Sequence, residues 1–166
     1  MKVGLGLGSN AGDRLSQLQH AKRYLLSRSL EQWHRASAVF ETTPVDCPPD
    51  SPSFLNAVIE IEFTGTPQTL LKEILAYETA QGRDRSAGRN TPRGIDIDLL
   101  YFGENEICEL DLVVPQPRLA ERRFVLTPLA MICPDLIVPG TGKTVRLLLS
   151  ELPERGETVK LIQQDW

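Results

Sequence analysis

Residues 81–102 read QGRDRSAGRNTPRGIDIDLLYF, an arginine-rich loop that runs into an apolar segment with two aspartates. Side chains of a β-strand alternate between its two faces, so Asp96 and Asp98 are predicted to share one face, about 6–7 Å apart. The other face, which belongs to a sheet core, would carry Ile95, Ile97 and Leu99. Adjacent carboxylates in a core strand repel each other and lose hydration, so the pattern indicates a compensating positive charge.

The loop itself is one source of that charge. It has four arginines and one acid, Asp84, and so a formal charge of +3 in a chain whose total is −4. The arginines are Arg83, Arg85, Arg89 and Arg93. Guanidinium groups match phosphate oxygens and carboxylates suit Mg²⁺, which favours a site for a nucleoside triphosphate with its metal. The alternative is a structural ion network of the two aspartates with Arg83 and Arg93.

Length and composition indicate one compact globular domain. The chain has 166 residues, 41% of them hydrophobic and 24% charged, and at this size folding buries roughly two thirds of the unfolded surface. No apolar run approaches the about 18 residues that a membrane span requires. The start, MKVGLGLGSN, is typical of a strand and not of a secretion signal. We therefore expect a cytoplasmic protein.

Cysteine spacing and net charge narrow the function classes. The three cysteines share no CxxC spacing, which argues against a disulfide framework or a zinc site and indicates reduced thiols; they are Cys47, Cys108 and Cys133. A net charge of −4 argues against a nucleic-acid coat. We expect no nucleic-acid partner, no membrane association and a monomer.

The remaining segments predict alternating strands and helices. In the first strand, glycines at positions 4, 6 and 8 alternate with apolar residues and leave one face bare for close approach of backbone or ligand. In residues 54–63, apolar positions alternate with mainly polar ones, a pattern that predicts a half-buried antiparallel strand. In chain order, the expected elements are a strand at 3–7, a helix over about 12–28, a strand from 36 to Thr43-Pro44, the strand at 54–63, a helix from Thr66-Pro67 to Gly82 and the strand at 95–102.

This order of strand, helix, strand, strand, helix, strand is typical of a ferredoxin-like βαββαβ sandwich of the α+β class. A hairpin is expected at residues 103–105. A helical extension follows, with a short helix at 117–123, a helix at 124–132 and a helical segment at 144–152. The proline-rich segment 44–53 is predicted to be a stiff loop. We expect a single domain over residues 1–166.

Two familiar phosphate-binding motifs are excluded. The glycines of the first strand do not follow GxGxxG, because Ser9 stands where a glycine is needed. The GTGKT sequence at 140–144 lacks the first glycine of a P-loop, because that position is Ile137, and we predict a surface turn. A nucleotide site in this chain therefore needs another architecture.

Several separated motifs occur in a characteristic order. GLGSN lies at 6–10, ETTP at 41–44, SFLNAV at 53–58, GRNTPRGIDIDLLYFG at 88–103, and VVPQPRLAERRFVLTPLAMICPDL at 113–136. Together they resemble the 6-hydroxymethyl-7,8-dihydropterin pyrophosphokinases of folate biosynthesis. The resemblance implies transfer of pyrophosphate from ATP to the hydroxymethyl oxygen of the pterin, with release of AMP. It also implies two Mg²⁺ ions held by Asp96 and Asp98.

The resemblance assigns roles to individual residues. Arg83 and Arg93 would stabilise transition-state charge, and the proton of the hydroxyl would go to Asp96 or be lost because bound metal lowers the pKa of the alcohol. Pterin contacts would come from Thr43, Pro44, Phe54, Asn56, Asp96 and Phe124. Phe54 and Asn56 are two apart on one strand face, as a joint site demands. ATP contacts would come from Glu78, Arg83, Arg85, Arg89, Arg93, Leu99, Gln116 and Arg122.

Some positions depart from the family pattern. Gln116 replaces the usual histidine and cannot become a cation, and Asn90 stands where some members have tryptophan, so nucleotide affinity could be weaker. An alternative interpretation is therefore a catalytically weak or inactive homologue that binds pterin or nucleotide. A third interpretation is an RNA-binding ferredoxin-like module, but this chain lacks the glycine-aromatic motif that such a module requires.

Overall fold

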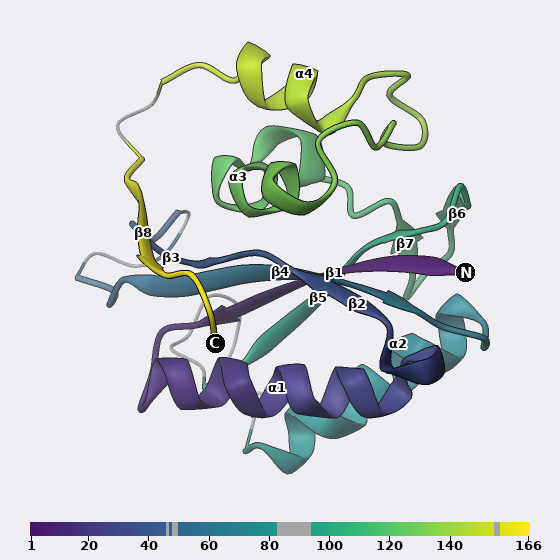
Figure 1. The fold of residues 1–166 in the computed structure, drawn as a ribbon, viewed down its shortest axis with the longest axis horizontal. Coiled ribbons are helices and arrows are strands. Elements are labelled where there is room, and N and C mark those ends of the chain that lie inside the picture. Colours follow the sequence, from purple (N-terminus) through teal and green to yellow (C-terminus); the bar gives the residue numbers. More distant parts are fainter. Residues whose placement is uncertain (46, 48–49, 83–93, 155–156) are drawn as a thin grey trace.

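An antiparallel β-sheet runs through the centre of the molecule (Figure 1). The computed structural model describes residues 1–45, 47, 50–82, 94–154 and 157–166. Within these residues the sheet has six strands, in the order β5-β1-β4-β3-β8, with β2 also paired to β4. Their bounds are β1 (Lys2–Ser9), β2 (His34–Ala36), β3 (Val39–Thr42), β4 (Phe54–Glu62), β5 (Asp96–Phe102) and β8 (Val159–Gln163).

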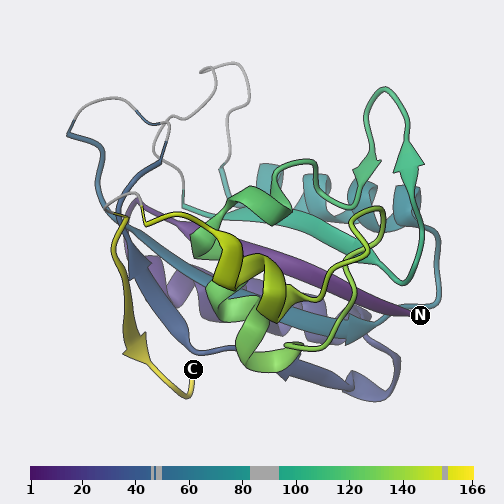
Figure 2. The ribbon, with the colours of Figure 1, turned by 90° about the horizontal axis from the view of Figure 1, so that it is seen from above.

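Helices cover both faces of this sheet (Figure 1). α1 (Arg14–Arg28) and α2 (Pro67–Ala80) lie on one face, and α3 (Arg123–Ile132) and α4 (Val145–Glu151) lie on the other. Figure 2 shows α3 and α4 from above, with a separate hairpin of β6 (Ile107–Cys108) and β7 (Val113–Val114) beside them. The predicted combination of helices with an antiparallel sheet is confirmed.

Side-chain caps and a glycine mark the helix ends. Asp13 caps α1 by accepting a hydrogen bond from Ser16 N, and Thr66 caps α2 by accepting one from Thr69 N. Gly82 ends α2 at φ +85°, a conformation that glycine adopts without steric cost. Thr144, at the end of the GTGKT turn, caps α4. The sequence therefore predicts these boundaries within two residues.

Two local predictions were wrong. Residues 117–123 form only a 3₁₀ turn, η3 (Leu119–Glu121), and not a full helix. The hairpin was predicted at residues 103–105, but it is formed by β6 and β7. The turn at 103–105 only redirects the chain out of β5. A main-chain bond from Gln116 N to Leu100 O ties the chain to β5 after the hairpin.

Strand β4 is buried on both faces, so the prediction of a half-buried strand was also wrong. Its residues Leu55, Ala57, Ile59 and Ile61 belong to the core under α1 and α2. Val58, on the other face, belongs to a second core with Leu126 and Leu129 of α3. The polar residue Glu60 on that face is only 3% exposed. The sequence of β4 alone could not reveal that α3 lies on its polar side.

A β-bulge between β1 and β5 orients the C-terminal part of β5. Leu5 pairs with Leu99, but Gly4 pairs with Tyr101, so Leu100 is an extra residue. Leu100 and Tyr101 consequently both join the core under α3. The Tyr101 ring fills the space that the prediction left bare on β1, because a Cβ at Gly4 would lie 2.0 Å from Tyr101 Cε1.

Tyr101 and Glu60 form a buried polar pair under α3. The Tyr101 hydroxyl donates to Glu60 Oε2 at 2.6 Å, and Arg35 Nη1 lies 3.9 Å from Glu60 Oε1. Burial and the bond to Glu60 raise the pKa of Tyr101 well above its usual value, so the hydroxyl remains a donor.

Among the described residues, the helices lack the length and apolar character that a membrane crossing needs. The three cysteines are free thiols, as predicted.

We predict that Tyr101→Phe destabilises the protein by about 1–3 kcal/mol, because it leaves a buried carboxylate without its donor. Tyr77→Phe is the matched control. The Tyr77 hydroxyl oxygen is also buried but has no hydrogen-bond partner within the described ranges, so its removal should change stability by less than about 0.5 kcal/mol. Urea denaturation measures both. Equal effects of the two substitutions would contradict the assigned role of the Tyr101–Glu60 bond.

Candidate active site

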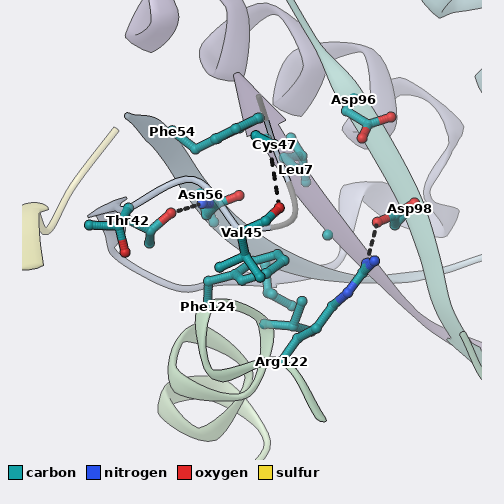
Figure 3. Close-up of a pocket in the computed structure, with 16 residues that line it drawn as sticks. Leu7, Thr42, Val45, Cys47, Phe54, Asn56, Asp96, Asp98, Arg122 and Phe124 are labelled. Atoms are coloured by element: carbon teal, nitrogen blue, oxygen red, sulfur yellow. Dashed lines mark hydrogen bonds and ion pairs between the residues drawn. The ribbon is translucent and has the colours of Figure 1, made fainter. Parts of the chain in front are cut away.

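A pocket opens between the sheet and the N-terminal end of α3 (Figure 3). Strands β1, β4 and β5 supply its floor, the segment after β3 supplies one wall, and α3 with the preceding residue Arg122 supplies another. We call it the first pocket. It is lined by Gly6, Leu7, Gly8, Thr42, Thr43, Val45, Cys47, Phe54, Asn56, Ala57, Val58, Asp96, Asp98, Arg122, Phe124 and Val125.

The two aspartates of β5 lie at one end of the first pocket (Figure 3). They pair with glycines of β1, Asp96 with Gly8 and Asp98 with Gly6. Ile97 and Leu99 point to the core under α1 and α2, so the predicted alternation along β5 is confirmed. Because glycine has no side chain, the floor beside the carboxylates stays open.

Asn56 lies at the other end with its amide fixed by a neighbour. Its Nδ2 donates to Thr42 Oγ1 at 2.6 Å, and a Cβ added at Gly8 would lie 3.1 Å from Asn56 Oδ1. The amide oxygen therefore faces the open floor over Gly8. Phe54 of β4 and Phe124 of α3 lie on two sides of the pocket between these ends (Figure 3).

Arg122 links the aromatic wall to the acidic end. Its Nη1 lies 3.8 Å from Asp98 Oδ2, and its guanidinium carbon lies 5.6 Å from the centre of the Phe124 ring. Such stacking stabilises a cation over an aromatic face. The arginine is thus held where it partly compensates the carboxylate.

A second pocket lies on the far side of the same two aspartates, between α2, β5 and the β6–β7 hairpin. It shares Asp96 and Asp98 with the first pocket, and its lining combines aliphatic side chains with two further acids. Its lining is Leu71, Leu75, Glu78, Asp96, Ile97, Asp98, Leu99, Asp111, Leu112, Val113 and Gln116. Glu78 is only 1% exposed, and its Oε1 accepts the main-chain N–H of Ile97 at 2.8 Å. It therefore joins α2 to β5.

Most of the predicted site residues lie around these two pockets. The first pocket brings together Thr43, Phe54, Asn56, Asp96, Asp98, Arg122 and Phe124, and the second adds Glu78, Leu99 and Gln116. Pro44 is described but does not line either pocket. Arg83, Arg85, Arg89 and Arg93 lie outside the described residues, as does any pairing of Arg83 or Arg93 with the aspartates.

Sequence reasoning missed several lining residues. Leu71 and Leu75 were assigned only to a helix, Val45 and Cys47 only to a loop, and Asp111 to nothing. For Asp111 no local signal was available, because the segment 103–114 also carries Glu104, Glu106 and Glu109. The glycines of β1 were recognised as a place for ligand approach, and Gly6 and Gly8 do line the first pocket.

The donor set at the junction of the pockets fits Mg²⁺. The described part of the chain has no group of three or more His, Cys, Asp or Glu that could hold a metal ion. Mg²⁺ is commonly bound by one or two carboxylates together with phosphate oxygens of a substrate. Asp96 and Asp98, reachable from both pockets, match that requirement.

Comparison with known proteins finds relatives along most of the chain. The 2-amino-4-hydroxy-6-hydroxymethyldihydropteridine pyrophosphokinase of Methylorubrum extorquens is 40% identical over 152 residues, which cover 92% of this chain and 94% of that relative. The Bacillus subtilis protein of the same name is 40% identical over 138 residues, covering 83% and 81%.

Solved structures show the same fold. The wild-type HPPK-DHPS of Plasmodium falciparum with STZ-DHP has a TM-score of 0.70 at 14% identity, covering 90% of this chain. This chain spans only 43% of that longer protein. Residues 4–134 match the 7,8-dihydro-6-hydroxymethylpterin-pyrophosphokinase (HPPK) family. With this match and close relatives along nearly the whole chain, the protein belongs to the HPPK family.

Proposed function

We propose that this protein transfers pyrophosphate from ATP to the hydroxymethyl group of 6-hydroxymethyl-7,8-dihydropterin in folate biosynthesis. Membership of the family and the names of its relatives favour this reading over a weak or inactive homologue. The observation that carries the proposal is the junction of two pockets at Asp96 and Asp98. One pocket suits a flat polar ring and the other suits a nucleotide, so their reacting groups would meet at the carboxylates.

The first pocket is proposed to bind the pterin. Phe54 and Phe124 offer apolar faces to the bicyclic ring, and Asn56 Oδ1 is free of the Thr42 bond and available to accept a ring N–H. Thr43 and Pro44 would add main-chain contacts from the segment after β3. The hydroxymethyl group would then point toward Asp96 and Asp98 at the opposite end (Figure 3).

The second pocket is proposed to bind ATP. Leu71, Leu99 and Leu112 of its lining would contact the nucleobase, and Gln116 would provide hydrogen-bonding groups. Glu78 would act partly by fixing β5 through Ile97. For the triphosphate we propose contacts from Arg122 and from the arginines of 83–93, namely Arg83, Arg85, Arg89 and Arg93.

The reaction requires the hydroxymethyl oxygen to attack the β-phosphorus. A new O–P bond forms, the bond from the β-phosphorus to the α,β-bridging oxygen breaks, and AMP leaves. Two Mg²⁺ ions held by Asp96 and Asp98 would neutralise phosphate charge and lower the pKa of the attacking hydroxyl. Asp96 would be the acceptor of the hydroxyl proton, a role that its place in the lining of both pockets supports. Arg122 would stabilise charge on the transferring group, as guanidinium groups do for phosphate, together with Arg83 and Arg93.

We further propose that the fold is of the ferredoxin-like type, within one domain over residues 1–166. Its support is the strand order β5-β1-β4-β3, the fourth, first, third and second strands of a βαββαβ unit, with α1 and α2 on one face. A monomer in the cytoplasm that binds small molecules and no nucleic acid remains our expectation. The free thiols and the net charge of −4 favour it.

The direct test is AMP formation from ATP, Mg²⁺ and 6-hydroxymethyl-7,8-dihydropterin, followed by chromatography. We expect AMP and pterin diphosphate in equal amounts, dependent on all three components. Saturable pterin binding without AMP would instead favour the inactive homologue. Absence of both binding and AMP would overturn the proposal.

We predict that Asp98→Asn lowers kcat by about 100-fold or more. Loss of a residue that only supports a metal ligand already lowers metal affinity or activity by about 10–100-fold, and Asp98 would bind the metal directly. Asp135→Asn is the matched control, since Asp135 is an exposed aspartate paired with Arg146 near α4. It should leave kcat unchanged. Steady-state assays over a range of Mg²⁺ concentrations make the measurement, and full activity of Asp98→Asn would show that the proposed metal site is wrong.

We predict that Phe54→Leu and Phe124→Leu each weaken pterin binding about 3- to 10-fold, because each removes one aromatic face from the ring site. The KM for ATP should stay within about twofold of the original, since neither residue lines the second pocket. Isothermal titration calorimetry gives the pterin Kd. Phe63→Leu is the control for general destabilisation, because Phe63 belongs to the core under α1 and α2. If all three variants bound pterin equally well, the aromatic site would be disproved.

A further inference from the structure

Three residues outside both pockets form a network next to Thr42 and Phe54, at the end of the β3–β4 pairing. We propose that Arg14, Glu41 and Ser53 are positioning residues that hold Thr42 and Phe54 in place and so set the affinity of the first pocket for the pterin. The inference rests on the proposed function, because it assumes that the first pocket is the pterin site. None of the three residues lines either pocket.

The network joins three separate elements through short hydrogen bonds. Arg14 Nη1, at the start of α1, donates to Glu41 Oε1 at 3.0 Å, to Ser53 Oγ at 2.8 Å and to Ser53 O at 2.8 Å. The Ser53 hydroxyl donates to the same Glu41 oxygen at 2.8 Å. The side chains of Arg14 and Glu41 are 30% and 35% exposed. Hydrogen bonds between charged partners are shorter and stronger than neutral ones.

Each strand-side member of the network is followed directly by a pocket residue. Glu41 precedes Thr42, and Ser53 precedes Phe54. Neighbouring residues on a strand point to opposite faces, so Glu41 meets Arg14 on the α1 side while Thr42 lines the first pocket. Any shift of Glu41 or Ser53 therefore moves a pocket residue on the other face.

The network lies where the pairing of β3 with β4 ends and where the chain needs further support. Pairing of β3 with β4 covers only three residue pairs, and the last of them is Thr42 with Phe54. Beyond that pair the chain leaves the sheet, and strand ends open easily without further support. Thr43 is tied to the chain before β8 by two bonds with Thr158, at 3.3 Å and 3.2 Å. The ties to Arg14 support the other side, where Ser53 leads into Phe54.

The charge state of Glu41 gives the network a pH signature. Hydrogen bonds from Ser53 and then Arg14 hold the pKa of Glu41 below its ordinary value, and the charge of Lys160 on β8 acts in the same direction, against a smaller effect of burial. A carboxylate with a lowered pKa stabilises the folded state fully above the unfolded pKa of about 4.3. That contribution is lost as the pH falls through the folded pKa.

We predict that the difference in urea midpoint between the unsubstituted protein and Glu41→Gln is constant from pH 6 to pH 8 and shrinks below about pH 4, as the carboxylate of the unsubstituted protein becomes protonated. Equilibrium denaturation at a series of pH values makes the measurement. A difference that does not change with pH would mean that the Glu41 charge has no part in the network.

The main test measures pterin and ATP binding separately in Arg14→Ala, Ser53→Ala and the double variant. We expect each single variant to raise the pterin Kd about fivefold to tenfold, with the KM for ATP within about twofold. The double variant should be little worse than either single variant, because the residues act as one unit. Ser53→Thr, which keeps the hydroxyl, should restore most of the affinity. A purely structural role would not separate pterin from ATP in this way.

Arg28→Ala is the matched control, because Arg28 lies at the other end of α1 and pairs with Glu73 of α2, away from the β3–β4 end. It should leave both affinities unchanged. The same pterin Kd for Arg14→Ala, Ser53→Ala and Arg28→Ala would overturn this inference alone, as would equal weakening of pterin and ATP. Failure of the unsubstituted protein to bind pterin would overturn the proposed function, and this inference with it. If Arg14→Ala does not fold, Ser53→Ala, which removes one oxygen atom, decides between these outcomes.

Discussion

The pairing of glycines on β1 with aspartates on β5 is the constraint on which the site depends. Gly8 lies opposite Asp96 and Gly6 lies opposite Asp98, so each carboxylate stands beside a strand position that has no side chain. A larger residue at Gly8 would meet Asn56 Oδ1 and occupy the floor between the amide and the acids. The open floor and the paired carboxylates therefore have a common origin in the register of two central strands.

The same register divides β1 and β5 between structure and function. Toward α1 and α2, the alternating residues Leu5, Leu7, Ile97 and Leu99 build one core. Toward α3, the bulge at Leu100 directs the side chains of Leu100 and Tyr101 into a second core, in which the Tyr101 ring packs over Gly4. Only the N-terminal half of β5 keeps its polar face open, and α3 extends over the sheet just far enough to bring Phe124 to that opening.

Local sequence predicted what depends on neighbouring residues. The alternation of Asp96 and Asp98 and the two ends of the helix from Thr66-Pro67 to Gly82 depend on residues within a few positions. The bulge at Leu100 and the burial of Glu60 depend instead on residues from other elements, and a single strand sequence holds no sign of them. The ties of Arg14 to Glu41 and Ser53 span 27 and 39 positions, so only the fold could reveal them. The family resemblance supplied roles for Phe54 and Phe124, which the residues alone would have left as core.

The formal charge of the two pockets bears on how a nucleotide can bind. In the described lining, Glu78, Asp96, Asp98 and Asp111 are acidic and Arg122 is the single cationic side chain, a formal balance of −3. A triphosphate that enters this site meets like charge, and like charges in a partly buried site repel strongly. Binding therefore needs positive charge beyond Arg122. In the proposed reaction, divalent cations on the two aspartates and the four arginines of 83–93 would supply this charge and would allow an acidic protein to bind a highly charged substrate.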